Sequence, residues 1–185
     1  MTEMPMPDEA QRVVDYWRHA GEEGQWFRHD PAFDRDFRER FLALHEAAAR
    51  GERDGWAVTP TGLLALLILL DQFPRNAFRG TARMYATDAR ARHWARRAQA
   101  VGAMARVETA LQLFFCLPFA HSEDLADQDL SVELNDRLGP EARRHAEGHR
   151  DIVRRFGRFP HRNPLLGRET TEAEAAFLRA GGFAG

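Results

Sequence analysis

The sequence of 185 residues predicts an all-α fold of about eight helices, arranged as antiparallel pairs in an α-solenoid-like stack or a compact bundle. Apolar residues recur at helical spacings of three and four, and helix start signals precede most apolar segments. No segment of the sequence shows the sustained alternation that is typical of a β-strand. A chain of this length is expected to form a single helical domain, residues 1–185.

Start signals place the first helices along the chain. Asp30 followed by Pro31 is typical of an N-cap and a first helical position. The pair Thr59 and Pro60 repeats this signal before an apolar segment. The helices expected in this part of the chain cover residues 8–20, 31–48 and 62–73. The third is apolar on every side, which predicts a position at the centre of the domain. Pro74 is expected to end it, because proline has no backbone N–H to donate.

The second half of the chain carries further start and stop signals. Pro118 is expected to end one helix, and Ser122 is expected to cap the next, with acidic residues in its first turn. Thr171 and Glu174 form the pattern of a capping box. The helices expected here cover residues 88–101, 108–117, 122–138, 141–156 and 171–181.

The composition is that of an ordinary globular protein, with 44% hydrophobic and 29% charged residues. The formal net charge is -2, so no basic excess favours nucleic acid as a partner. All 26 basic residues are arginine, and lysine is absent from the sequence. A bias of the coding genome explains this more simply than selection for anion binding, although every cation is then a planar group that suits carboxylates and phosphates.

Several features indicate the compartment. Residues 1–15 lack the basic and apolar regions of a signal peptide. The longest apolar run, residues 63–70, is far shorter than the roughly 20 residues of a membrane-spanning helix. The single Cys116 excludes an internal disulfide and indicates a reducing environment. We therefore expect a cytoplasmic protein that does not associate with membranes.

Polar side chains interrupt the apolar framework in three segments. The first contains Asp71, Arg75 and Asn76, directly after the most hydrophobic helix. Charged groups beside a buried helix need partners or a solvent-filled cleft, so a local ion pair and a ligand site are both consistent with this segment. In the second segment, His121 lies beside Glu123. Glu123 suits a helix N-terminus, whereas His121 beside it is also consistent with an oriented acid or base.

The third segment follows a helix that carries His149 on its apolar side. A lone histidine there is more often a hydrogen-bonded core residue than a ligand. The loop after the helix contains Arg158, His161, Arg162 and Asn163 in a proline-restricted stretch. Four arginines lie between residues 155 and 168. They imply either buried carboxylate partners in the other two segments or an anionic ligand.

Other chemistries fit the sequence less well. It contains no glycine-rich phosphate loop, HExxH pair or GxSxG elbow. Cys116 lies among apolar residues, which makes it a poor nucleophile. His121, Glu123, His149 and His161 are suitable metal ligands by type, but their spacings match no recognised pattern. We predict no metal site and name no cofactor.

The three polar segments resemble a known family. Their sequences are LLDQFPRN at residues 69–76, PFAHSE at residues 118–123 and FGRFPHRN at residues 156–163. Motifs of this length in this order look like the signature of the bacterial domain-of-unknown-function family 924. The resemblance covers nearly the whole chain and implies a helical fold of the tetratricopeptide-like superfamily. It implies no established reaction.

Three functions are consistent with these observations. The first, which we favour, is a small-molecule binder or an enzyme that acts on a small polar or anionic metabolite. Its ligand-binding residues are expected to be Asp71, Arg75, Asn76, Arg158, Arg162 and Asn163, and its catalytic residues His121, Glu123 and His161. The second is a protein- or peptide-binding helical-repeat scaffold, inferred from architecture alone. The third is a closed polar network that only fixes how the helices stack and leaves no cavity. The partners expected are thus a small anion or a peptide, and no oligomeric state is predicted.

Overall fold

The computed structural model describes residues 8–185, and every regular element among them is helical. This confirms the all-α prediction. The chain forms two compact units, which are described separately below. The N-terminal unit holds the described residues up to Arg79 together with Arg83–Pro118, and the C-terminal unit holds Gly80–Ala82 and Phe119–Gly185. The expectation about a signal peptide falls partly on residues 1–7, which lie outside the described residues.

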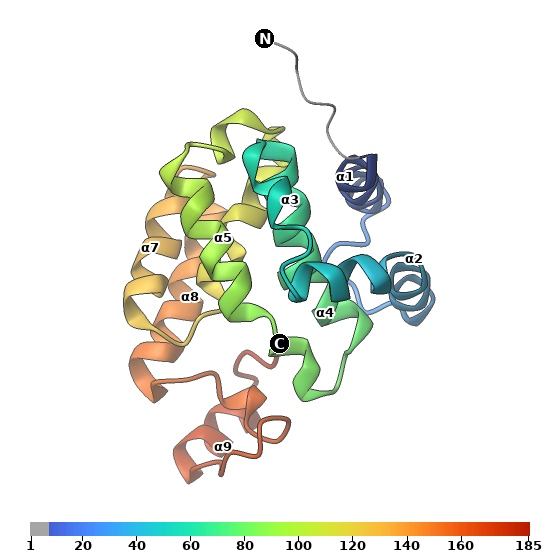
Figure 1. Ribbon diagram of the computed structural model, residues 1–185. Helices are drawn as coiled ribbons and strands as arrows, with labels where there is room; N and C mark the ends of the chain where they lie inside the picture. The colour runs from blue at the N-terminus through green and yellow to red at the C-terminus, as the bar shows by residue number, and fades with distance from the viewer. Residues whose placement is uncertain (1–7) are drawn as a thin grey trace. The chain divides into compact units, whose positions relative to one another are not determined.

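Five α-helices and several short helical segments build the N-terminal part of the chain (Figure 1). The α-helices are α1 (Asp8–Glu22), α2 (Pro31–Ala49), α3 (Pro60–Leu67), α4 (Phe73–Ala77) and α5 (Asp88–Ala100). A π-helical segment, Ile68–Gln72, joins α3 to α4. The 3-10 segments are Asp54–Val58, Ala82–Tyr85, Met104–Arg106 and Thr109–Phe115. As predicted, Asp30 caps α2, because its side chain accepts the backbone N–H groups of Ala32 and Phe33.

Helix α3 forms the centre of this unit, as its uniform hydrophobicity predicts. Residues 62–70 are all buried, and α1 and α5 pack against them. Helices α1 and α2 meet through aromatic rings, with the centroids of Trp17 and Phe37 5.3 Å apart. Helix α2 packs along α4. Helices that are not adjacent in sequence therefore pack together in this unit: α1 packs on α3, and α2 packs on α4.

The prediction that Pro74 ends the central helix is wrong. Pro74 lies in the first turn of α4, which follows the π-helical segment without a break. In that segment the N–H of Phe73 donates to the carbonyl of Ile68, five residues earlier. The wider turn resets the hydrogen-bond register, so proline occupies a first-turn position where its missing N–H is not needed.

The helix predicted over residues 108–117 is also different in the structure. Thr109–Phe115 forms a 3-10 helix, and Pro118 lies inside the short α6 (Leu117–Ala120) instead of ending a helix. Leu111, Phe114 and Phe115 of the 3-10 helix are buried. In a 3-10 helix, side chains three residues apart lie on the same side, so Leu111 and Phe114 are buried together. Burial of these side chains outweighs the α-helical preference of the sequence.

The C-terminal unit is built on the pair α7 (Leu125–Asp136) and α8 (Pro140–Phe156). Three residues join these two helices, which pack closely along each other as a helical pair. A loop containing the 3-10 segment Pro160–Arg162 leads to α9 (Glu172–Arg179), which begins with the predicted capping box of Thr171 and Glu174. The predicted N-cap at Ser122 is wrong, because Asp124 caps α7 and accepts the N–H groups of its first turn.

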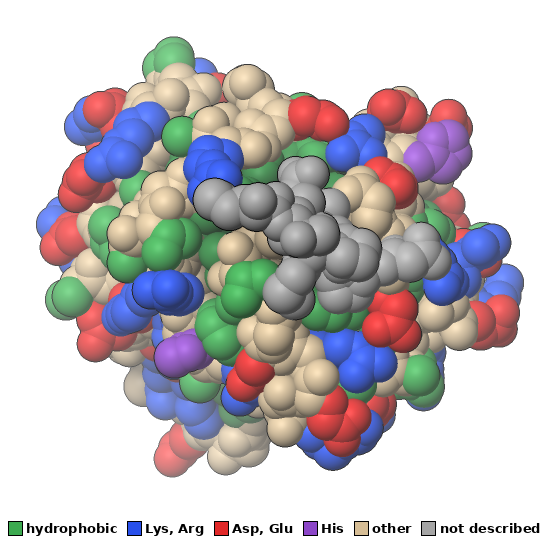
Figure 2. All heavy atoms as spheres, turned by 45° about the horizontal axis from the view of Figure 1, so that its top comes forward, with side chains coloured by type: hydrophobic (Ala, Val, Ile, Leu, Met, Phe, Trp, Pro, Cys, Tyr) green, Lys and Arg blue, Asp and Glu red, His purple; other side chains and the backbone are tan. Residues whose placement is uncertain are grey.

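Two further expectations concern the surface. No helix of the described residues has both the length and the apolar character needed to cross a membrane. Arginine and carboxylate side chains are interspersed on the face shown in Figure 2, which displays no broad area of one charge. This mixture agrees with the formal net charge of -2.

Candidate functional site

The polar residues of the first segment bind one another in the N-terminal unit. The guanidinium of Arg75 donates to both carboxylate oxygens of Asp88 at 2.9 and 3.1 Å, and to the main-chain oxygen of Asp71 at 2.8 Å. It also lies 3.4 Å from the carboxylate of Asp71. Burial opposes the charge of Arg75, but the two carboxylates outweigh it and raise the pKa of Arg75 above its ordinary value. A local ion pair, one of the two alternatives that the sequence left open here, is therefore present between Asp71 and Arg75, with Asp88 as an additional partner.

Asn76 has a structural contact in the same unit. Its amide donates to Asp34 Oδ1 at 2.7 Å, and Arg79 forms an ion pair with the same carboxylate at 2.8 Å. Asp34 belongs to the first turn of α2, so this contact fastens the start of α2 to the end of α4. The amide of Asn76 thus has a role that requires no ligand.

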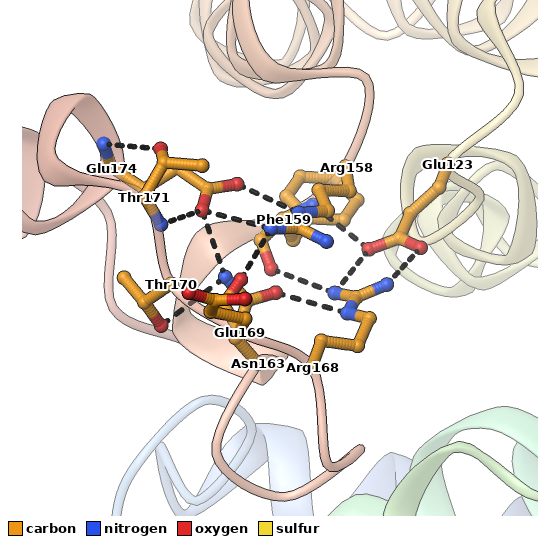
Figure 3. Close-up of polar contacts among 9 residues, drawn as sticks. All are labelled: Glu123, Arg158, Phe159, Asn163, Arg168, Glu169, Thr170, Thr171 and Glu174. Atoms are coloured by element: carbon orange, nitrogen blue, oxygen red, sulfur yellow. Dashed lines mark hydrogen bonds and ion pairs between the residues drawn. The ribbon is translucent and has the colours of Figure 1, made fainter.

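Glu123 accepts three hydrogen bonds in the C-terminal unit (Figure 3). Two come from Arg168 at 2.7 and 2.9 Å, and one comes from the backbone N–H of Phe159 at 2.8 Å. Burial alone would raise the pKa of Glu123, but the bonds from Arg168 and Phe159 outweigh it and lower that pKa. Glu123 therefore remains charged and fixes the start of the loop after α8.

Glu174 is the second carboxylate of this network. Arg158 donates to its two oxygens at 2.7 and 2.9 Å, and Asn163 donates to one of them at 3.1 Å. The backbone N–H of Thr171 adds a bond at 2.8 Å. The bonds from Arg158 are the largest cause that lowers the pKa of Glu174 to about 2. Arg168 also donates to Asn163 at 2.9 Å, so the two carboxylates belong to one continuous network.

Two of the remaining predicted residues of this unit, His161 and Arg162, lie against Phe159, and Arg162 contacts the main chain of the third, His121. The guanidinium of Arg162 is buried, donates to the main-chain oxygen of His121 at 2.9 Å and lies 4.6 Å from the ring centroid of Phe159. The ring centroids of His161 and His149 each lie 5.8 Å from that of Phe159. We call His121, His149, His161 and Arg162 the histidine cluster.

His149 was interpreted from the sequence as a core residue, but the structure leaves it half-buried in this cluster. Its Nδ1 lies 3.0 Å from the carbonyl of His145, which only accepts, so Nδ1 carries the proton and Nε2 keeps a free lone pair. Burial, followed by the positive charge of His121, lowers the pKa of His149 to about 4. Charge at His145 and Arg162 acts in the same direction. His149 is therefore neutral at pH 7 in an electropositive environment.

A groove of about 430 Å³ lies in the same unit, along α8. It is lined by Arg144, His145, Gly148, His149, Asp151, Ile152, Arg155, Phe156, Phe177 and Phe183. None of the nine site residues predicted from the sequence is among these lining residues. His149 is the residue that belongs to both the groove and the histidine cluster.

The structure thus divides the nine predicted residues. Asp71, Arg75 and Asn76 lie in the N-terminal unit, and the other six lie in the C-terminal unit. Within the part of the chain that the structure describes, no group of three or more His, Cys, Asp or Glu side chains is placed to hold a metal ion. Catalytic and ligand-binding roles for the nine residues stay predictions.

The sequence indicated carboxylates of the other two segments as partners of the arginines in residues 155–168, and the pairing of Arg168 with Glu123 confirms this. It missed two other carboxylate partners. Asp88 lies 13 residues from Arg75, and Glu174 lies 16 residues from Arg158. Asp88 was noted only as a helix start and Glu174 only as part of a capping box. The capping box could have indicated Glu174, because it fixes this carboxylate at the start of α9, close to the loop after α8. Its pairing with Arg158 could not be predicted, because it depends on how the chain folds between the two residues.

These observations define an all-helical protein in which polar motifs hold each unit together and a histidine cluster lies beside a groove. The chain belongs to a bacterial family of proteins of unknown function, DUF924, whose family model matches residues 13–182. This confirms the resemblance found in the sequence. A solved structure of a protein of unknown function, ATU0120 from Agrobacterium tumefaciens, is 53% identical, with a TM-score of 0.90. The similarity covers 93% of this chain and 97% of that one. A comparison with curated proteins gives no match.

Proposed function

We propose that this protein is a cytoplasmic binder of a small polar or anionic metabolite, and that the histidine cluster of the C-terminal unit is the binding site. The observation that carries the proposal is the convergence of two separate sequence motifs at Arg162. One motif supplies His121, whose main-chain oxygen accepts from Arg162, and the other supplies Arg162 and His161, which both lie against Phe159. Residues that are far apart in sequence, and that can carry positive charge, thus lie together beside a groove.

The electrostatics of the cluster support an anion as the ligand. The carboxylate of Glu123 is bound by Arg168 and by a backbone N–H, and it also interacts electrostatically with Arg162. His149 has a depressed pKa because of burial and the positive charge of its neighbours. Such an environment favours an added negative charge, since a bound anion offsets the repulsion among the cations. In this proposal Arg162, together with His121 and His161, holds the anion.

The other predicted residues have a supporting role in this proposal. Arg158, Asn163 and Glu123 belong to the network of Figure 3, which fixes the loop that carries His161 and Arg162. A rigid loop keeps the binding groups in place before the ligand arrives, which limits the entropy lost on binding. We propose binding only, and no reaction.

The test is a titration of the purified protein with inorganic phosphate and with acetate at low ionic strength, followed by calorimetry and by NMR of the His149 ring. Low ionic strength is needed because salt screens the attraction. Binding is expected to raise the pKa of His149 from about 4, and a ligand at 100 times its Kd is expected to add about 2.7 kcal/mol of stability. Arg162→Gln and, separately, His161→Gln are expected to weaken binding.

The matched control is Arg154→Gln. Arg154 lies on α8, is exposed and forms only a 3.4 Å surface pair with Asp129, so this variant is expected to bind as the wild type does. If neither anion binds, or if Arg154→Gln weakens binding as much as both cluster variants do, the proposal is wrong.

One observation favours a second candidate, a protein- or peptide-binding scaffold with structural polar motifs. The carboxylates and guanidinium groups of Figure 3 satisfy one another without a ligand, as such a scaffold requires. This candidate predicts no effect of small anions on stability or on His149. The titration above therefore separates the two functions.

A further inference from the structure

The groove along α8 has apolar lining residues and open space beside Gly148. Phe156 and Phe177 form an aromatic pair, with ring centroids 5.1 Å apart, and Phe183 lines the groove while 41% exposed. Gly148 lies among the lining residues, and a Cβ atom placed there would meet nothing within 4 Å. A volume of about 430 Å³ lies within the range of small-molecule pockets.

The edges of the groove are mainly basic. Arg144, Arg155, His145 and His149 line it, against the single carboxylate of Asp151. Among the described residues, neither arginine of the groove has a carboxylate within 4 Å. The other two arginines in this part of the same helix differ, since Arg150 and Arg154 both pair with Asp129, at 3.6 and 3.4 Å.

Arg155 is positioned by aromatic rings instead of by an acid. Its guanidinium lies 4.7 Å from the ring centroid of Phe156 and 5.7 Å from that of Phe177. Stacking of this kind orients the guanidinium and leaves its in-plane N–H groups available to an acceptor. The groove therefore presents apolar rings and uncompensated positive charge side by side.

We infer that the α8 groove binds a small amphipathic anion, with a carboxylate or phosphate group joined to an aromatic or branched apolar body. The apolar body lies over Gly148 and Ile152, against the rings of Phe177 and Phe183. The anionic group lies at the edge formed by His149, where the groove meets the histidine cluster, and Arg155 adds positive potential from the other edge. This inference rests on the proposed function, because it names the ligand class of the site that contains His149.

Four probes test this inference by calorimetry: phenyl phosphate, inorganic phosphate, phenylacetate and acetate. Each phenyl compound is expected to bind about tenfold or more tightly than its counterpart without the ring, because the ring becomes buried. The phosphate and carboxylate pairs show which head group the site prefers. Benzyl alcohol, which carries the ring without the charge, is expected to bind more weakly than either phenyl anion.

The most specific variant is Gly148→Leu, with Gly148→Ala as its matched control. The leucine side chain is expected to fill the groove and to remove the advantage of the phenyl compounds without unfolding α8, because its Cβ has room and leucine favours helix. Gly148→Ala adds only a methyl group and is expected to keep that advantage. Phe183→Ala is expected to reduce it, and Arg155→Gln is expected to weaken both phenyl anions by about three- to tenfold.

The results distinguish this inference from the proposed function. If inorganic phosphate or acetate binds and depends on Arg162, but the ring adds no affinity, the proposed function holds and the inference is wrong. If the ring adds affinity that Gly148→Leu and Phe183→Ala leave unchanged, the apolar body binds elsewhere and the inference is also wrong. If no anion binds, both are wrong.

Discussion

Substitution of Glu123 by glutamine is the most direct test of whether this residue has a structural role. The carboxylate accepts two bonds from Arg168 and one from the backbone N–H of Phe159. Glutamine keeps the size of the side chain but removes the charge and replaces one acceptor oxygen with an NH₂ group. At least one donor of Arg168 or Phe159 then faces another donor, which leaves polar groups unsatisfied.

The magnitude follows from the partial burial of this pair. Removing one partner of a fully buried ion pair costs about 3 to 5 kcal/mol, whereas an exposed pair contributes less than about 1 kcal/mol. The side chains of Glu123 and Arg168 are 27% and 23% exposed. Arg168 also keeps its bonds to Asn163 and to the carbonyl of Phe159. We therefore expect Glu123→Gln to lower the free energy of unfolding by about 2 kcal/mol.

The measurement is urea unfolding at pH 7 of the wild type, Glu123→Gln, Arg168→Gln and the double variant. The double-variant cycle should give a coupling energy of about 1 to 2 kcal/mol between the two residues. A loss of stability below about 0.5 kcal/mol, or a coupling energy near zero, would refute a structural role for the pair. Phosphate titration of folded Glu123→Gln adds a functional readout: weaker binding is expected because the loop that carries Arg162 is less rigid, and unchanged affinity would contradict this supporting role.

Two further predictions concern the same unit. The folded pKa of Glu174, about 2, lies below its ordinary value of 4.5, so its contribution to stability is fully present above pH 4.5 and is lost as the pH falls toward 2. Urea unfolding between pH 2 and 7 should show this loss, and Glu174→Gln should show a smaller one; equal slopes for the two proteins would contradict the assignment. Phe159 is 1% exposed and contacts His149, His161 and Arg162 of the histidine cluster. Phe159→Ala should cost about 3 to 5 kcal/mol of unfolding free energy, while Phe159→Leu should cost clearly less, and a cost of Phe159→Ala below 1 kcal/mol would show that the cluster does not depend on this ring.

Local signals in the sequence predicted much of the fold. The Asp30 cap, the buried α3 and the capping box of α9 all depend on residues close together in the chain, and all are confirmed. Pro74 was interpreted wrongly because the π-helical turn before it arises where the central helix packs against its neighbours. Helix propensity and residue spacing do not describe that packing, so no local pattern predicts the change in the helical hydrogen-bond register.

The sequence predicted which residue types the polar site contains, but not which of them bind one another. The sequence showed that Arg158 needs either a carboxylate or a ligand, and the structure provides the carboxylate of Glu174. Choosing between the two interpretations required the position of α9, 16 residues further along the chain. The same limit applies to Asn76 and Asp34, which are 42 residues apart.

The sequence contains part of the information that predicts the groove along α8. His145, His149, Ile152 and Phe156 follow one another at spacings of four, three and four, which places them on one side of a helix. This pattern alone does not distinguish a core face from a groove. Gly148 on the same side is the distinguishing signal, because a glycine inside a helix costs about 0.5 to 1 kcal/mol relative to alanine. The structure shows open space at that position. A glycine beside two histidines in an otherwise regular helix is consistent with a face that leaves room for another molecule, and Gly148→Leu tests that interpretation directly.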